Sequence, residues 1–384
     1  MRVFVLFAGM LVVALAVTAC REEAPTQNET DFVFPDIDLL DPDNQFDMVI
    51  VAPPTTHTYL SLLVSTRNQE GIRTAVITPE HINETFPQTS LREGISGVVA
   101  ESQNRWQEPH TQYLLLVGSE AEIPAFRFRS RFANTPDSIE EYIDLDWPYA
   151  LNIEDGDSLP DLAVGRIPFS DKSKLKNLLA KILSYPGPGF YKIMALSDAD
   201  TANNNYYEQF ADHFIDRVSD DVQKGRFDIR PDAPHAISPT AFLDSLARGT
   251  AYLNYFGLAT PTSWSQSDFL NQSILQMLQN SRRPFFLYQF HQEGAVFSPI
   301  LEALLTLEEG GACGAIVPTG YNYAYTTDQI LNNVYMVLLN QNHPRIGDAF
   351  LTIQQSGFLR FPGNNQEIHR LRLVGDPSMP IPQF

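Results

Sequence analysis

The first part of the chain alternates short, fully apolar runs with amphipathic segments. The apolar runs at 48–52, 74–77, 113–117 and 162–166 predict four buried strands. Between them, segments 57–70, 91–106 and 170–185 have apolar residues at helical spacing and predict three helices, the first ended by Gly71. Apolar strands that alternate with amphipathic helices indicate a parallel sheet covered on both faces.

The same alternation resumes after Pro186-Gly-Pro-Gly189, the strongest internal boundary in the sequence. Strands are predicted at 193–196, 251–255, 284–290 and 313–317. Helices are predicted at 206–223, 240–248, 267–281, 298–307, 328–339 and 346–356, with Ser238-Pro239 as a helix start. The pattern therefore predicts an α/β fold of two subdomains with mainly parallel sheets, at residues 47–186 and 190–384.

The N-terminus has the features of an exported lipoprotein. Arg2 precedes a short apolar run that ends at Val17-Thr-Ala-Cys20, which is similar to a bacterial lipobox. Residues 1–19 are therefore predicted to be a signal peptide, and Cys20 to carry the lipid. Residues 20–46 are acidic and predict a tether, in which Phe32, Phe34 and Leu39-Leu40 are candidates for docking on the domain. Arg21 after the cysteine favours an outer-membrane location in the cell envelope, on either its periplasmic or its surface face.

Charge and cysteine content exclude several classes of function. The formal net charge is −20, which argues against nucleic-acid binding because such binding relies on Lys and Arg. The charge also leaves the N-terminal lipid as the only predicted contact with a membrane. With Cys20 lipidated, Cys313 is the only remaining thiol of the two cysteines, so no intramolecular disulfide is expected. No zinc-ligand spacing and no phosphate-binding loop are present, and no cofactor is predicted.

Several segments between residues 47 and 381 together resemble the gingipain family of cysteine peptidases. They are Asp47-Met-Val-Ile-Val-Ala-Pro53, Tyr113-Leu-Leu-Leu-Val-Gly-Ser-Glu-Ala-Glu-Ile-Pro124, Asp155-Gly-Asp-Ser-Leu-Pro-Asp-Leu-Ala-Val-Gly-Arg-Ile-Pro168, Gly310-Gly-Ala-Cys-Gly-Ala-Ile-Val317 and Leu373-Val-Gly-Asp-Pro-Ser-Met379. The resemblance implies that the second subdomain has the caspase-like fold of that family. It also implies that a catalytic histidine and a catalytic cysteine should follow two neighbouring strands.

Neither catalytic residue is found where the resemblance places it. The segment that should contain the histidine reads Asn254-Tyr-Phe-Gly-Leu-Ala259, with Leu258 at the histidine position. The segment that should contain the cysteine reads Pro284-Phe-Phe-Leu-Tyr-Gln-Phe-His-Gln-Glu-Gly294, with His291 at the cysteine position. Cysteine acyl transfer needs a thiolate that a neighbouring base activates, and leucine cannot act as that base.

The polar residues at the end of this second strand are candidates for binding. His291, Gln292 and Glu293 follow the strand at its carboxyl end, where the resemblance places the cleft. They either bind a peptide or only cap loops. The resemblance also places Trp264 beside the cleft as a contact candidate, whereas Tyr288 is expected in the core.

Two further features favour structural interpretations. Cys313 begins its strand and thus lies roughly 15 Å from the carboxyl end, which favours a buried core thiol over a nucleophile. Asp155, Asp157 and Asp161 could bind structural Ca²⁺, but their spacing lacks the closing glutamate of an EF-hand and favours a plain acidic turn. A serine nucleophile between Thr260 and Ser265 has no histidine base in the adjacent strand.

Three hypotheses about function follow. The first is a lipid-anchored, proteolytically inactive relative of the gingipains that binds an extended peptide or a protein partner in the envelope. The second is a working peptidase, either cysteine-type or with displaced residues such as His291 and Glu293. The third is a structural envelope protein whose cleft is idle. The oligomeric state, the partner and the physiological process are not encoded in any recognisable feature.

Overall fold

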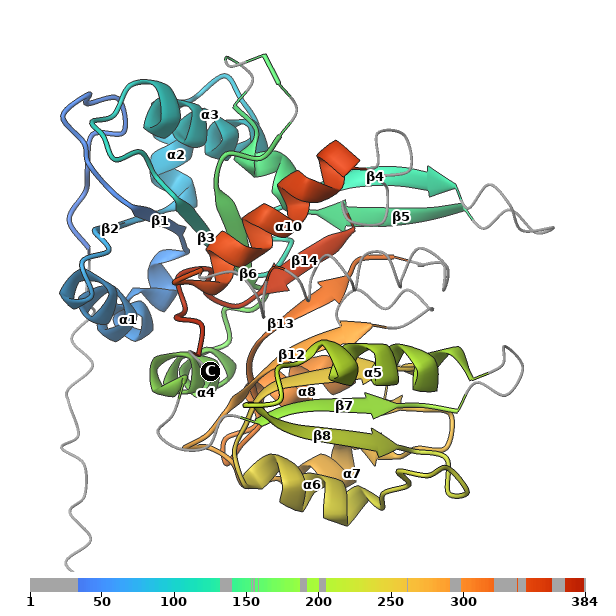
Figure 1. The fold of residues 1–384 in the computed structure, drawn as a ribbon. Coiled ribbons are helices and arrows are strands. Elements are labelled where there is room, and N and C mark those ends of the chain that lie inside the picture. Colours follow the sequence, from blue (N-terminus) through green and yellow to red (C-terminus); the bar gives the residue numbers. More distant parts are fainter. Residues whose placement is uncertain are drawn as a thin grey trace, which may run out of the picture.

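In the computed structural model, the described residues are 34–131, 140–152, 154, 156–157, 159–186, 192–199, 205–260, 262–290, 298–320, 337, 343–360 and 370–382. A ten-stranded sheet forms the centre of the molecule, in the order β2-β1-β3-β6-β14-β13-β12-β9-β7-β8 (Figure 1). Its strands are β1 Met48–Val51, β2 Thr74–Ile77, β3 Tyr113–Val117, β6 Ala163–Ile167, β7 Lys192–Ser197, β8 Gln223–Asp228, β9 Thr250–Phe256, β12 Phe285–Phe290, β13 Ala312–Pro318 and β14 Leu371–Val374. All eight strands predicted from apolar runs are present, which confirms the predicted α/β class.

The sheet consists of two parallel groups that run in opposite directions. Strands β2, β1, β3, β6 and β14 are parallel to one another, and so are β13, β12, β9, β7 and β8. The groups meet where β13 and β14 pair antiparallel. As a result, the carboxyl ends of the two groups lie at opposite edges of the sheet. Elements from both sides of the Pro186 boundary thus share one continuous sheet.

Helices cover the sheet close to where the sequence predicts them. The described helices are α1 His57–Gln69, α2 Pro79–Thr85, α3 Leu91–Asn104, α4 Lys172–Ser184, α5 Tyr206–Arg217, α6 Pro239–Ala247, α7 Gln272–Leu275, α8 Pro299–Thr306 and α10 Ile346–Arg360, with 3₁₀ turns η1 Pro54–Thr56 and η2 Trp147–Ala150. Gly71 has a φ of +85° directly after the first helix, and the Ser238 side chain caps α6 with Pro239 at its first position, so both predicted boundaries are confirmed. The helix predicted at 328–339 lies outside the described residues, apart from residue 337.

Two predicted helices are wrong in extent. The helix predicted over 206–223 ends at Arg217, because Val218 adopts an extended conformation and the chain then forms the edge strand β8. The helix predicted over 267–281 is reduced to the four residues of α7. Residues just before it instead form the short hairpin β10 Ser263–Trp264 and β11 Leu270–Asn271, and the Asn271 side chain caps α7. The turn of this hairpin requires a positive φ at Asp268, which a helix does not allow.

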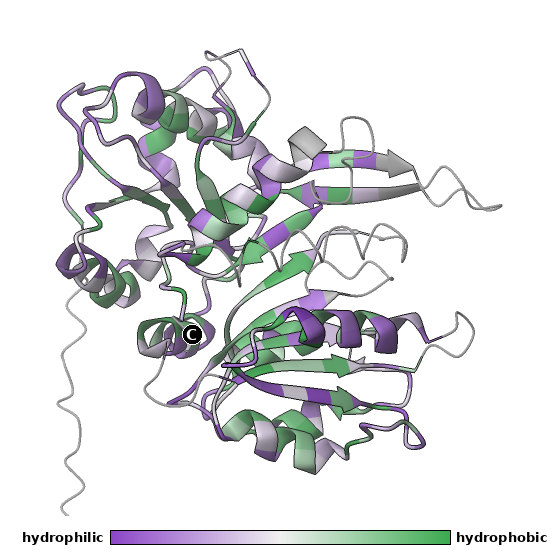
Figure 2. Cartoon of the chain, in the orientation of Figure 1, coloured by the Kyte–Doolittle hydropathy of each residue, from purple (hydrophilic) through white to green (hydrophobic). Residues whose placement is uncertain are grey.

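The apolar residues gather between the sheet and the helices. Figure 2 shows hydrophobic colour along the central strands and hydrophilic colour on α5. Every residue of β13 is buried, as expected for a central strand covered on both faces. Among the residues that the structure describes, no helix is both long and apolar enough to cross a bilayer.

The C-terminal motif is bound to the first helix through a buried ion pair. The Arg67 guanidinium donates two hydrogen bonds to Asp376 Oδ2, at 2.9 and 2.7 Å, and both side chains are at most 2% exposed. Asp376 Oδ1 accepts from the Ser378 amide and hydroxyl, both at 2.7 Å. A Cβ on Gly165 would lie 2.4 Å from the Gly375 carbonyl oxygen, so glycine is required at 165. The closing motif therefore has a structural role.

Part of the acidic N-terminal segment packs on the domain. Leu39 is fully buried, and its carbonyl accepts a hydrogen bond from Trp106 Nε1 at 3.1 Å. The Phe34 ring lies edge-on to His57 at 5.2 Å between ring centroids. Docking is therefore observed for Phe34 and Leu39, whereas Leu40 is half exposed. Phe32 and Cys20 lie outside the described residues.

Candidate functional site

Three neighbouring parallel strands end together at one edge of the sheet. Phe256 of β9 pairs with Ser197 of β7 on one side and with Phe290 of β12 on the other. The residues that follow these strands are Asp198, then Gly257 and Leu258, and then His291. The two positions at which the resemblance expects the catalytic pair thus follow adjacent strand ends. His291, Gln292 and Glu293 themselves lie outside the described residues.

Asp198 is a buried carboxylate at this edge. It is 4% exposed, and its amide donates to the Phe256 carbonyl at 2.8 Å. Its Oδ1 accepts hydrogen bonds from the Ala199 amide at 2.8 Å and from Ser265 Oγ at 2.7 Å. Its Oδ2 accepts a longer bond from the Leu258 amide at 3.4 Å. The carboxylate is therefore bound to loop groups of the protein itself.

The backbone of Leu258 is hydrogen-bonded at both its amide and its carbonyl. Its amide bonds to Asp198, and its carbonyl accepts from Tyr255 Oη at 2.6 Å and from the Ser265 amide at 2.9 Å. Burial raises the pKa of Tyr255, so the phenol stays protonated and donates. The Leu258 side chain is half-buried and packs against the main apolar cluster. The backbone is ordered here, but the side chain has no group that transfers a proton.

Two backbone features, at Gly257 and at Ser265, allow Asp198, Tyr255 and Leu258 to lie this close together. A Cβ on Gly257 would lie 2.5 Å from both Asp198 Cβ and Tyr255 Oη, so a larger residue does not fit. Ser265 adopts a φ of +67°, an uncommon conformation for a non-glycine residue. Its hydroxyl reaches both Asp198 and Ser267 Oγ, the latter at 2.9 Å.

The structure corrects the prediction for Trp264. Its side chain is fully buried and stacks on Tyr255, with ring centroids 4.3 Å apart and an interplanar angle of 3°. Because the indole lies inside the core, it does not offer a contact surface to a ligand at the strand ends. Tyr288 is 2% exposed, which confirms the predicted core position.

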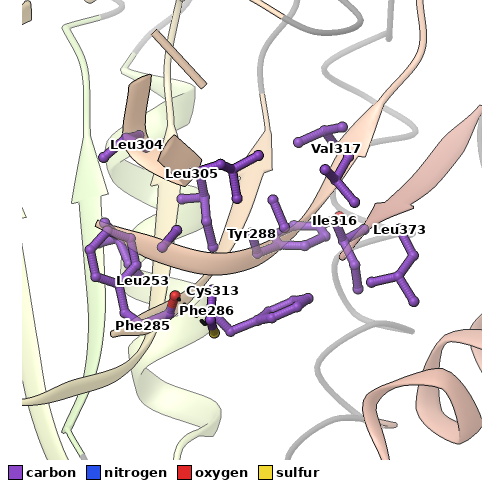
Figure 3. Packing of buried hydrophobic residues seen from close by; sticks show 14 of the residues in the cluster. Leu253, Phe285, Phe286, Tyr288, Leu304, Leu305, Cys313, Ile316, Val317 and Leu373 are labelled. Atoms are coloured by element: carbon purple, nitrogen blue, oxygen red, sulfur yellow. Dashed lines mark hydrogen bonds between the residues drawn. The ribbon is translucent and has the colours of Figure 1, made fainter. Parts of the chain in front are cut away.

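Cys313 is a core thiol, as predicted. It is the second residue of β13, is fully buried, and donates from Sγ to the Phe285 carbonyl at 3.4 Å. Figure 3 shows it among apolar side chains that include Phe285 and Phe286. Burial raises the pKa of the Cys313 thiol well above its usual range, so it is not a reactive thiolate.

The acidic turn fits the plain structural interpretation. Asp157 Oδ1 accepts from the Leu159 amide at 2.7 Å, and Asp161 Oδ2 accepts from the Asn152 amide at 3.1 Å. Asp155 lies outside the described residues. Within the part of the chain that the structure covers, no three His, Cys, Asp or Glu side chains gather as a metal site would require.

Sequence reasoning missed Asp198 and Ser265. Asp198 had a detectable signal, since it directly follows an apolar strand at its carboxyl end, where functional residues of parallel sheets gather. Ser265 had none, because its contact with Asp198 spans 67 positions and depends on the positive φ of the turn.

Comparisons with known proteins agree with this fold. Residues 41–382 match the sequence model described as Peptidase family C25. Gingipain R2 of Porphyromonas gingivalis (strain ATCC BAA-308 / W83) is 20% identical over 353 residues, which cover 86% of this chain and 45% of the relative. The chain thus spans less than half the length of that curated relative.

Solved structures give the same result for the fold. The complex of the Porphyromonas gingivalis RgpB pro- and mature domains matches with a TM-score of 0.68 and 18% identity, covering 87% of this chain and 79% of that one. The crystal structure of the Arg-specific cysteine proteinase gingipain R matches with a TM-score of 0.66 and 17% identity, covering 89% and 79%. On the fold and the match over residues 41–382, this chain belongs to peptidase family C25.

Proposed function

We propose that this protein is a proteolytically inactive, lipid-anchored member of its family that binds an extended peptide or a protein partner in the bacterial cell envelope. The observation that supports the proposal is Leu258, the residue at the position where the resemblance expects the catalytic base, whose backbone is hydrogen-bonded to Asp198 and Tyr255. An aliphatic side chain neither accepts a proton nor activates a nucleophile.

The cysteine content supports the same proposal. The sequence contains two cysteines, and Cys313 is fully buried with a raised pKa. Cys20 is assigned to the lipid by the N-terminal pattern. Neither thiol is then available at the strand ends that follow Phe256 and Phe290. Asp198 nevertheless accepts hydrogen bonds from Ala199, Ser265 and Leu258 at this edge, and this retained scaffold supports a binding role.

A peptide-binding screen tests the binding role. Residues 21–384 with Cys20→Ser would be screened against a display library of extended peptides. The peptides selected would then be titrated into a variant with His291, Gln292 and Glu293 changed to Ala. The matched control changes three exposed residues elsewhere to Ala: Gln223, His235 and Glu308. Loss of binding only in the first variant supports the proposal. Equal binding to both variants, or no selected peptide, contradicts it.

Lipid attachment is a separate prediction of the proposal. Cells that express the full chain would be given an alkyne-labelled fatty acid, and the protein would be isolated. Label on the unaltered chain but not on Cys20→Ser supports lipidation at that residue. Equal label on both forms, or none on either, contradicts it.

The two rival hypotheses give different results in these experiments. A peptidase that uses displaced residues would turn over a peptide, and turnover would stop with His291→Ala and Glu293→Ala. If Cys313 were the nucleophile, alkylating its thiol would abolish turnover. A structural protein with an idle cleft would neither cleave nor bind, and removing the acidic segment at 20–46 would leave every envelope phenotype unchanged.

A further inference from the structure

The hairpin of β4 Phe126–Arg131 and β5 Glu140–Leu145 stands apart from the central sheet. The two strands pair only with each other among the residues described, and Figure 1 shows them projecting past β14. Each strand therefore has an outer edge with no neighbouring strand. A two-stranded ribbon has marginal stability in water on its own, and exposed edges are sites where another chain can pair.

The base of the hairpin is firmly anchored. The Phe126 ring lies edge-on to Tyr149, with centroids 4.8 Å apart, and the Arg92 guanidinium lies 5.3 Å from the same ring. Ile143 and Leu145 are buried. The buried Arg372 guanidinium donates to the Asp144 carbonyl at 2.9 Å, which holds β5 against the domain. This leaves β4 as the strand with the accessible edge.

The strand register divides the hairpin into two faces. One face carries the opposed pair Phe128 and Ile143, and the other carries Arg129 opposite Tyr142. The Arg127 guanidinium lies 4.8 Å from the centre of the Tyr142 ring. Phe128 is 44% exposed and Tyr142 is 60% exposed. Large aromatic side chains are thus at the surface on both faces.

The charge of β4 is opposite to that of the whole protein. The chain carries a formal charge of −20, yet β4 reads Phe-Arg-Phe-Arg-Ser-Arg and contains no acidic residue, and the residues of β5 opposite Arg127 and Arg131 are Asp144 and Glu140. In a strand added beside β4, the residues opposite Arg127 and Arg129 share their face, and the residue opposite Phe128 shares the other. Carboxylates pair strongly with guanidinium groups, so the complementary sequence alternates acidic and apolar residues.

We propose that the outer edge of β4 binds an extended, acidic segment of a partner polypeptide as a third strand, with acidic residues opposite Arg127 and Arg129 and an apolar residue opposite Phe128. Backbone hydrogen bonds supply the binding, and the alternating side chains supply the specificity. This surface is separate from the strand ends around Asp198 and Leu258. The proposal for β4 can therefore be tested independently of the proposed function.

The probe is a fluorescein-labelled peptide of alternating Glu and Val, seven residues long and beginning with Glu. Binding to the full chain would be measured by fluorescence anisotropy. A block peptide of the same composition, with all Glu before all Val, is the peptide control. We expect the alternating peptide to bind at least tenfold more tightly. Equal affinities would overturn the proposal, because a purely electrostatic contact does not distinguish two peptides that differ only in the order of Glu and Val.

Charge reversal identifies the site. Arg127→Glu with Arg129→Glu is compared with Arg248→Glu and Arg282→Glu, two exposed arginines elsewhere in the chain, so both double variants change the net charge equally. We expect at least tenfold weaker binding only in the first variant, which should instead bind an alternating Lys and Val peptide. Equal losses in both variants would contradict the proposal. No binding to the unaltered chain would show that the arginines only protect the edge from pairing.

Hydrogen exchange tests the strand addition without any substitution. We expect the alternating peptide to slow amide exchange at residues 126–131 of the unaltered chain by at least tenfold, and to leave residues 223–228 of the other edge strand, β8, unchanged. Slowing at β8 alone, or at neither edge, would overturn the assignment to β4.

Discussion

Ser265 Oγ donates a hydrogen bond to Asp198 Oδ1 at 2.7 Å, which joins the turn after β10 to the end of β7. Both side chains are buried. Through this bond and the contacts of Tyr255, the turn fixes the backbone of Leu258. The backbone of Leu258 is thus held in place at this edge of the sheet, and its side chain is aliphatic.

Asp198→Asn should destabilise the protein. The change weakens three hydrogen bonds to a buried carboxylate, and bonds to charged groups contribute about 1.5–3 kcal/mol each. We expect the free energy of unfolding to fall by about 1–3 kcal/mol in urea titrations. The control is Asp216→Asn on the exposed face of α5, which should change it by less than about 0.5 kcal/mol. Equal effects would show that the Asp198 bonds do not hold the turn.

The buried pair of Arg67 and Asp376 should be a major determinant of stability. Removing one partner leaves the other charge buried, which typically costs about 3–5 kcal/mol. We expect Arg67→Met to lower the free energy of unfolding by that amount, and Asp376→Asn to lower it by less, because Arg67 keeps its ion pair with Glu70. The double variant should lose less than the sum of the two, because no unpaired charge remains. Strict additivity in a double-mutant cycle would contradict a direct coupling.

The sequence predicted the sheet well because its strands are fully apolar and buried on both faces. The Leu-Arg-Leu-Val run of β14 was missed because Arg372 interrupts it, and Arg372 is buried through its ion pairs with Asp146 and Glu120 rather than by its own hydrophobicity. The hairpin of β4 and β5 was missed because its strands carry exposed charges. At the site, the assignment of Leu258 to the histidine position stays a prediction from the neighbouring motifs. The burial of Trp264 could not, because it depends on the hairpin of β10 and β11.

Lys181 should make stability depend on pH. Its Nζ donates to the carbonyls of Leu304, Leu307 and Gly310 at 3.3, 2.9 and 2.9 Å, and burial lowers its pKa to about 7. Above that pH the folded state has lost a proton that the unfolded state keeps until about 10.5. Stability contributed by Lys181 therefore rises with pH in this window.

Comparison with Lys181→Met isolates this effect, because the other titrating groups are common to both proteins. Between pH 7 and 9, the free energy of unfolding of the unaltered protein should rise relative to that of the variant by up to about 2 kcal/mol. Urea titrations at several pH values measure it. A difference that stays constant would show that the three carbonyls keep the ammonium protonated.

Cys313 should be inert towards alkylation in the folded protein. Its thiol is fully buried and its pKa is raised, so little thiolate is present. In the Cys20→Ser form, iodoacetamide at pH 8 should leave the folded chain unmodified over hours and should label it within minutes in denaturant. Mass spectrometry gives the extent of labelling. Rapid labelling of the folded chain would place the thiol at the surface, contrary to the structure.

The most direct test of the proposed function is proteome-wide cleavage profiling with residues 21–384 carrying Cys20→Ser, beside the same protein with Cys313→Ala. The proposal predicts that neither sample generates new peptide termini above a heat-inactivated control. Cleavage that disappears with Cys313→Ala would contradict it and make Cys313 the nucleophile. Cleavage that persists would contradict it equally and point to a mechanism at His291, without a cysteine.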